Sequence, residues 1–200
     1  EKDFSLTIVL LRYLEKIKME NSYVLVMMQL DLMRPYPMVR KEVEKPRWQY
    51  RSALNGILVQ EKDLAIETPD DCKPVTNVLP TDEQIADMLF ANKIVKNSKS
   101  NSIVLAKNGQ LLASGVGQTS RVDALKQAIE KARSFGFSLE GAVMASDAFF
   151  PFGDCVQLAH EAGITAVIQP GGSVRDNESV DYCNDHGVAM VMTGVRHFKH

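Results

Sequence analysis

Apolar and polar positions follow two different periods along this chain, most clearly in its second half. Several segments repeat apolar residues every three or four positions, the spacing of one helix face. These predicted helices cover 82–97, 120–136 and 154–162, with another near 176–186. Short apolar runs lie between them, as expected for strands buried on both faces. These predicted strands cover 102–106, 110–114, 142–146, 164–168 and 188–192.

Local signals support the ends of these elements. Thr81 followed by Gln84 is typical of a capping box at a helix start, and Ser120 is a good N-cap for the next helix. The pair Asn108-Gly109 tolerates positive φ at both positions, so it predicts a tight hairpin turn between the first two strands.

Strands separated by single helices predict parallel βαβ units. The sequence therefore predicts an α/β fold, a three-layer unit with a mainly parallel sheet, helices on both faces and a β-hairpin. Ligands of such sheets sit beyond the carboxyl ends of the strands. Three segments are expected there: 146–152, 169–173 and 193–200.

The first part of the chain is less regular, and we expect a partial N-terminal segment over 1–79 followed by a subdomain over 80–200. The polar, proline-containing stretch 63–80 indicates a linker or a surface excursion. Three further elements are predicted upstream of it: a helix over 5–18, a strand over 23–28 and a strand or extended segment over 50–60.

Composition narrows the class of protein. The chain has 200 residues, 45% of them hydrophobic, which is enough to bury a core. Its net charge of −2, with both signs interspersed, argues against nucleic acid and membrane surfaces as partners. The longest apolar run, 6–11, is far short of the roughly 20 residues that span a bilayer. Three cysteines far apart favour a reduced compartment, and we expect a cytoplasmic protein.

Two carboxylates, Asp147 and Asp154, flank an aromatic cluster just after a predicted strand. In one interpretation they help to form a pocket for a flat ring. In the other, the aromatic residues form a hydrophobic staple before a helix that Asp154 caps. Spacing favours neither.

Other strand ends have comparable alternatives. The loop 169–173 (QPGGS) lets a ligand approach backbone amides, or it is an ordinary βα turn. The segment 115–121 offers amides and Arg121 to a carboxylate, although it lacks a full dinucleotide fingerprint. In the basic tail 196–200, Arg196 suits a phosphate and a histidine suits proton transfer, whereas a frayed tail is the simpler interpretation. No C-x-x-C spacing occurs, so we do not expect catalytic zinc.

Five ordered motifs resemble the end of the AICAR transformylase/IMP cyclohydrolase family: 99–104 (KSNSIV), 115–121 (GVGQTSR), 144–152 (MASDAFFPF), 168–176 (IQPGGSVRD) and 195–200 (VRHFKH). The resemblance is dense over 80–200. It implies a cytidine-deaminase-like fold without zinc. The implied activity is transfer of a formyl group from 10-formyltetrahydrofolate to AICAR, in a homodimer with the site at or near the subunit interface.

The same resemblance implies particular site residues. The implied catalytic residues are Asn101, Asp154 and His200. The nucleotide contacts would be Arg196, Phe198 and Asn101. The folate-binding set would be Arg121, Val122, Phe149, Pro151, Phe152, Asp154, Gly172 and Ser173. A potassium ion would be held, mostly by backbone carbonyls, at Ile94, Ser98, Ser100, Ser102, Asp147, His197 and Lys199.

The chain also departs from the family. Gly153 and Cys155 replace common family residues, and the motif Phe-Lys-His-x-Asn-Pro, whose Lys and His carry the central acid–base work, does not occur. The triplet 198–200 matches the separate C-terminal motif instead. We therefore expect the isolated chain to lack formyltransferase activity. A noncatalytic nucleotide- or folate-binding module, or a dimerisation module of the same fold, is the alternative.

Overall fold

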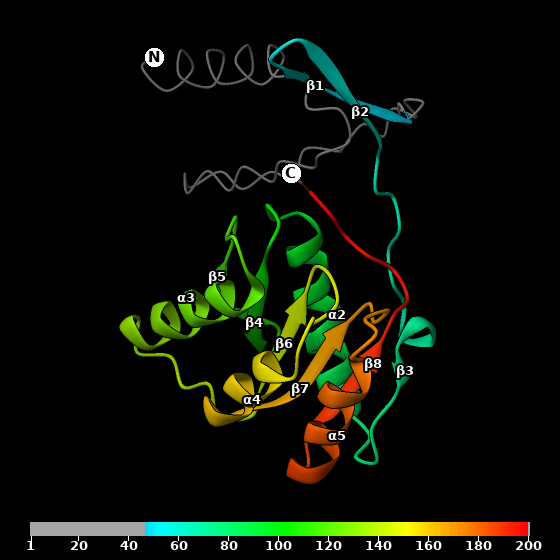
Figure 1. The fold of residues 1–200 in the computed structure, drawn as a ribbon. Helices are drawn as coiled ribbons and strands as arrows, with labels where there is room; N and C mark the ends of the chain where they lie inside the picture. The colour runs from blue at the N-terminus through cyan, green and yellow to red at the C-terminus, as the bar shows by residue number, and fades with distance from the viewer. Residues whose placement is uncertain (1–46, 200) are drawn as a thin grey trace, which may run out of the picture. The chain divides into compact units, whose positions relative to one another are not determined.

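The computed structural model describes residues 47–199 of the chain (Figure 1). Its contacts divide the chain into one compact unit that ends at Lys62 and another that begins at Asp63. The predicted helix over 5–18 and strand over 23–28 lie outside the described residues.

In the first unit, the described residues form an antiparallel hairpin of β1 (Trp48–Ala53) and β2 (Gly56–Glu61). The predicted strand or extended segment over 50–60 is thus confirmed as strand, but a turn at Leu54 and Asn55 divides it into two.

The second unit contains a six-stranded sheet and four α-helices among its described residues. The strands are β3 (Lys73–Pro74), β4 (Ile103–Lys107), β5 (Gln110–Gly115), β6 (Ala142–Ser146), β7 (Ile164–Gln169) and β8 (Ala189–Met192). The helices are α2 (Asp82–Lys96), α3 (Arg121–Ser134), α4 (Asp154–Glu161) and α5 (Asp176–His186), with a short 3-10 helix at Pro69–Asp71.

The sheet order is β3-β8-β7-β6-β4-β5. Only the pairings β6–β7 and β7–β8 are parallel, and the other three are antiparallel. The α/β class is confirmed, and the βαβ units expected over 142–192 do pair in parallel, as β6, β7 and β8. The sheet as a whole is mixed rather than mainly parallel. The chain reverses at the β4–β5 hairpin, so its strands pair antiparallel.

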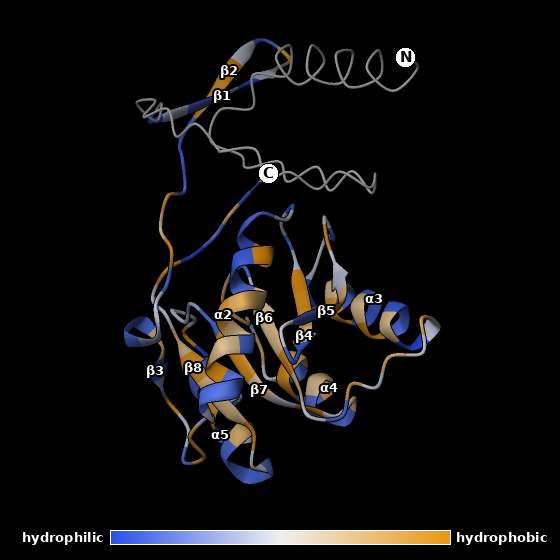
Figure 2. Cartoon of the chain, turned by 180° about the vertical axis from the view of Figure 1, so that it is seen from behind, coloured by the Kyte–Doolittle hydropathy of each residue, from blue (hydrophilic) through white to orange (hydrophobic). Residues whose placement is uncertain are grey.

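Helices cover both faces of the sheet, as predicted. Helix α2 packs on one face through Met88, Ala91 and Val95, whereas α3, α4 and α5 pack on the other. The central strands are the most apolar part of the unit (Figure 2), in keeping with burial on both faces. Two core clusters result, one on each side of the sheet.

The predicted helix start and hairpin turn are both confirmed. Thr81 accepts a hydrogen bond from the Gln84 amide at 3.2 Å, and Gln84 Oε1 accepts one from the Thr81 amide at 2.9 Å. Asn108 and Gly109 have φ of 54° and 69°. The buried carboxylate of Asp87 accepts hydrogen bonds from both of their amides, at 2.7 and 2.6 Å, and so ties the turn to α2.

The segment 63–79 belongs to the second unit, which begins at Asp63. The sequence pattern instead predicted a linker or surface excursion over 63–80 and a domain boundary between 79 and 80. Strand β3 pairs with β8 at the sheet edge. The Met190 amide donates to Thr76 Oγ1 at 2.9 Å, and Cys72 is buried. A two-residue edge strand that contains proline has no apolar run by which a sequence could reveal it.

The three cysteines are free and buried, as expected for thiols outside a disulfide framework. Burial raises the pKa of Cys155 and of Cys183 to about 12. Within the part of the chain that the structure describes, no helix is long and apolar enough to cross a membrane.

Candidate functional site

The tail that follows β8 lies against the ends of β4 and β6, and backbone hydrogen bonds fix it there. The His197 amide donates to the Asp147 carbonyl at 2.9 Å, just beyond β6. The Ser100 amide donates to the Lys199 carbonyl at 2.8 Å, and the Lys199 amide donates to Ser100 Oγ at 3.0 Å. The alternative interpretation as a frayed tail is therefore wrong for residues up to Lys199.

Four side chains form a cation–aromatic cluster at this place: Arg121, Phe149, Arg196 and Phe198. The Arg196 guanidinium lies 4.7 Å from the ring centre of Phe149 and 5.3 Å from that of Phe198. Arg121 lies 5.8 Å from the Phe198 ring centre. The cluster joins two residues implied for the nucleotide with two implied for the folate, and such contacts orient a guanidinium by attraction to the ring face.

The Arg121 side chain is buried in an ion pair. Its Nη2 atom lies 3.2 Å from Asp147 Oδ1, and the two side chains are 11% and 0% exposed. The Arg121 Nε and the second Asp147 oxygen are buried without a hydrogen-bond partner among the described residues. Buried groups of this kind normally find a partner, so these two atoms are the ones of the ion pair that can take a further hydrogen bond.

Two features fix the position of Arg121 at the first turn of α3. Ser120 caps the helix by accepting a hydrogen bond from the Asp123 amide at 3.1 Å. At the end of β5, Gly115 lies so close to α3 that a Cβ atom there would be 1.8 Å from the Ala124 carbonyl oxygen. Only glycine permits this approach.

Asn101 lies between the tail and the loop before α3. Its Nδ2 donates to the carbonyls of Gln118 and Thr119 at 3.0 and 3.1 Å. Both amide hydrogens are therefore engaged, and Oδ1 is the atom that Asn101 can offer to a ligand, as an acceptor.

Asp154 occupies the first turn of α4 but does not cap it. Gly153 is the N-cap residue, and no side-chain capping hydrogen bond is formed. Of the two interpretations of this segment, the one in which Asp154 caps the helix is therefore wrong. Its carboxylate raises the pKa of Cys155 after the larger effect of burial, whereas Arg121 lowers it, so Asp154 and Arg121 both act on this thiol.

The loop after β7 has the form of an ordinary βα turn. The amides of Gly172 and Ser173 donate to Asp176 Oδ2 at 2.6 and 3.1 Å, so the acceptor for these amides is the protein's own carboxylate. The other residues of the implied folate set are placed separately: Val122 packs against the core, Pro151 is exposed, and Phe152 is 47% exposed beneath the Arg175 guanidinium.

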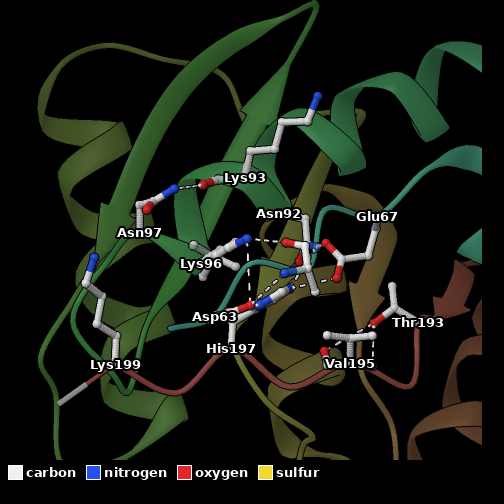
Figure 3. A network of polar contacts seen from close by, with 12 residues as sticks. Asp63, Glu67, Asn92, Lys93, Lys96, Asn97, Thr193, Val195, His197 and Lys199 are labelled. Atoms are coloured by element: carbon white, nitrogen blue, oxygen red, sulfur yellow. Dashed lines mark hydrogen bonds and ion pairs between the residues drawn. The ribbon is translucent and has the colours of Figure 1, made fainter. Parts of the chain in front are cut away.

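A buried polar network on the other side of the tail was not predicted from the sequence (Figure 3). His197, which is 1% exposed, places Nδ1 2.6 Å from Asp63 Oδ2 and Nε2 3.1 Å from Glu67 Oε1. Asn92 Nδ2 donates to Glu67 Oε2 at 2.8 Å. One signal was available, because Asn92 is a polar residue four positions after Met88 on the buried face of α2.

The positions implied for potassium lie together. Ser98 Oγ donates to the Ile94 carbonyl at 2.9 Å, and the carbonyls of Ser102, Asp147 and Lys199 accept backbone hydrogen bonds within the same patch. A carbonyl keeps a second lone pair, and neutral oxygens of this kind suit potassium, so these residues fit the ion. The described residues hold no cluster of three or more His, Cys, Asp or Glu suited to a metal. His200 lies outside them.

Comparisons with known proteins found relatives that match most of this chain. The bifunctional purine biosynthesis protein PurH of Bacteroides thetaiotaomicron is 71% identical over 163 residues, which cover 82% of this chain and 32% of that protein. The PurH protein of Aquifex aeolicus is 56% identical over 150 residues, covering 75% of this chain and 29% of that protein. The chain thus spans about a third of the length of these relatives.

Among solved structures, the apo dCMP deaminase of cyanophage S-TIM5 is similar with a TM-score of 0.40 and 18% identity, covering 56% of this chain and 98% of that chain. A family model described as "AICARFT/IMPCHase bienzyme" matches residues 21–131, more than half of the chain. The chain therefore belongs to the AICARFT/IMPCHase bienzyme family.

Proposed function

We propose that this chain supplies the nucleotide- and folate-facing part of an AICAR formyltransferase, which transfers a formyl group from 10-formyltetrahydrofolate to AICAR in purine biosynthesis. The observation that carries the proposal is the cation–aromatic cluster, which gathers two guanidinium groups and two aromatic rings on a chain of this family. Its place beyond the carboxyl end of β6 is where ligands of open α/β sheets bind.

The phosphate of AICAR would bind the exposed Arg196 guanidinium. A guanidinium presents parallel N–H donors that match two phosphate oxygens. The rings of Phe149 and Phe198 lie close to the central carbon of this guanidinium and limit its orientation. The buried Arg121, with its unpartnered Nε, would face the folate.

In the transfer itself, the 5-amino nitrogen of AICAR forms a bond to the formyl carbon, and the bond from that carbon to N10 of the folate breaks. The amine loses one proton and N10 gains one, so the step is balanced. Asn101 Oδ1 would accept a hydrogen bond from the amine and orient its lone pair, since Asn101 Nδ2 is already engaged. Asp154 and His200 are the proposed proton-handling groups of this chain.

The potassium ion and the homodimer of this proposal rest on the resemblance to the family. A potassium ion would stabilise the tail through the carbonyl patch, and a second copy of the enzyme would complete the site as a homodimer. Location in the cytoplasm agrees with three free, buried thiols.

The experiment is Arg196→Ala in a full-length bifunctional enzyme that carries this segment. We expect the KM for AICAR to rise at least about tenfold, the scale of one lost charge-assisted contact, with little change for the folate. Arg133→Ala, which removes an exposed arginine at the far end of α3, is the matched control. Equal losses for both substrates would show that the tail is structural and would favour the noncatalytic module.

A further inference from the structure

We propose that Glu67 is a positioning residue for the nucleotide site, and that it acts through the buried ring of His197 to hold Arg196 and Phe198 in place. This inference rests on the proposed function, because it assigns a role in AICAR binding to a residue that cannot itself reach the ligand side of the tail.

The tail has two sides with different contacts. Side chains alternate along an extended segment, so neighbours of His197 point away from it. His197 faces the interior, where it is 1% exposed, whereas Arg196 and Phe198 join the cation–aromatic cluster. A shift of the His197 ring therefore moves both neighbours, which belong to the same short stretch of backbone.

Glu67 is well suited to fix that ring. Its side chain is 4% exposed, and Oε1 lies 3.1 Å from His197 Nε2. The second oxygen accepts a hydrogen bond from Asn92 at 2.8 Å, and Asn92 is 3% exposed on α2. The contacts thus run from a core helix to the tail without passing through solvent (Figure 3).

Asp63 contacts the opposite side of the same ring. Its Oδ2 lies 2.6 Å from His197 Nδ1, and its Oδ1 lies 3.7 Å from the Lys96 ammonium. Both ring nitrogens thus lie within ion-pair distance of carboxylate oxygens, and Asn92 Nδ2 lies 3.4 Å from Nε2. Glu67 Oε1 makes no hydrogen bond among the described residues, so Glu67 limits the ring by this close contact rather than as an acceptor. Glu67 is the more buried of the two partners, at 4% against 28% side-chain exposure, so it has less freedom to move.

The test uses Glu67→Ala in the full-length bifunctional enzyme. We expect the KM for AICAR to rise about tenfold with the folate KM within about twofold, because a displacement of about 1 Å at a contact costs up to about a hundredfold. Glu67→Gln should recover much of the loss, since it keeps the size of the side chain and an oxygen that can accept from Asn92. Asp87→Ala, which removes another buried carboxylate that accepts hydrogen bonds from the β4–β5 turn, should lower the melting temperature without this selective rise in KM.

A double-mutant cycle gives the second readout. If Glu67 acts through His197, Glu67→Ala should add less than about twofold to the AICAR KM of a His197→Gln enzyme. Additive effects, or equal losses for AICAR and folate, would overturn the positioning role. Arg196→Ala, measured in parallel, separates the two proposals. If Arg196→Ala raises the AICAR KM and Glu67→Ala does not, only the positioning role fails. If neither does, the proposed nucleotide site itself is wrong.

Discussion

Replacement of Asp154 by asparagine separates a structural role from a functional one. Gly153 is the N-cap of α4, and Asp154 makes no capping hydrogen bond, so asparagine removes no cap. The structural contribution that disappears is a negative charge near the helix N-terminus, worth about 0.3–1 kcal/mol at an exposed position. For a protein of this size that corresponds to a fall in Tm of about 1–4 °C.

The functional role predicts a much larger change in kinetics. A contact between a carboxylate and a bound ligand contributes about 1.5–3 kcal/mol, so its loss lowers kcat/KM for the folate roughly ten- to hundredfold. Cys155 does not confuse the result. Its pKa is raised first by burial and only then by Asp154, so the thiol stays protonated at neutral pH in the variant.

The assay is folate-linked absorbance in the full-length enzyme, with thermal unfolding followed in parallel. Asp82→Asn is the matched control, because Asp82 is the first residue of α2 as Asp154 is of α4, and both are exposed. We expect similar small shifts in Tm for the two variants and a loss in folate kcat/KM for Asp154→Asn alone. Near-normal folate kinetics in Asp154→Asn would refute the assignment of this residue to the folate site.

Two further predictions concern stability and reactivity. Asp87→Ala should destabilise the second unit by about 2 kcal/mol in urea unfolding, because it removes two charge-assisted hydrogen bonds to the hairpin turn. The loss is limited because the freed amides can partly hydrogen-bond to water. An unchanged urea midpoint would contradict this. Cys155 and Cys183 should resist iodoacetamide in the folded protein by mass spectrometry, since the thiolate is the reactive form. Their raised pKa has a second effect. Unfolded thiols ionise near 9.0 and folded ones near 12, so the unfolded chain binds fewer protons in between and stability should fall as pH rises through this window.

The helices and central strands of the second unit were predictable because their signals are local. A capping box at Thr81, an Asn-Gly turn at Asn108 and apolar runs buried on both faces each depend on a few adjacent residues. The helix α4 was predicted, but spacing could not decide between the two roles considered for its first residue, Asp154. Gly153 has backbone angles that let the helix begin one residue earlier than a search for capping side chains suggests.

The missed parts depend on pairing between distant segments. Strand β3 exists because Lys73 and Pro74 meet the edge of β8, and nothing in their own sequence predicts that. The pairing of β4 with β6 could not be predicted for the same reason, since β6 follows only after a hairpin and a helix. Pairing partners this far apart are fixed by the packing of α2 and α3 on the two sheet faces, which local periodicity does not encode.

In the tail, neighbouring residues of one short motif have different contacts on the two sides of the backbone. From the sequence alone, a run of basic and aromatic residues after a strand suits a phosphate site, whereas a frayed tail is the simpler interpretation. The structure separates the residues by alternation, with His197 inside against Glu67 and with Arg196 and Phe198 outside around Phe149. The interior contacts reach across 134 residues to Asp63, so the order of the tail depends on a segment that the sequence presents as a linker. Cations displayed on an anchored segment lose less conformational entropy when a phosphate binds than cations on a free one, because the backbone is already ordered. The polar network around His197 and the cluster around Arg196 are therefore two sides of one segment, and substitutions in the network should change the position of the side chains in the cluster.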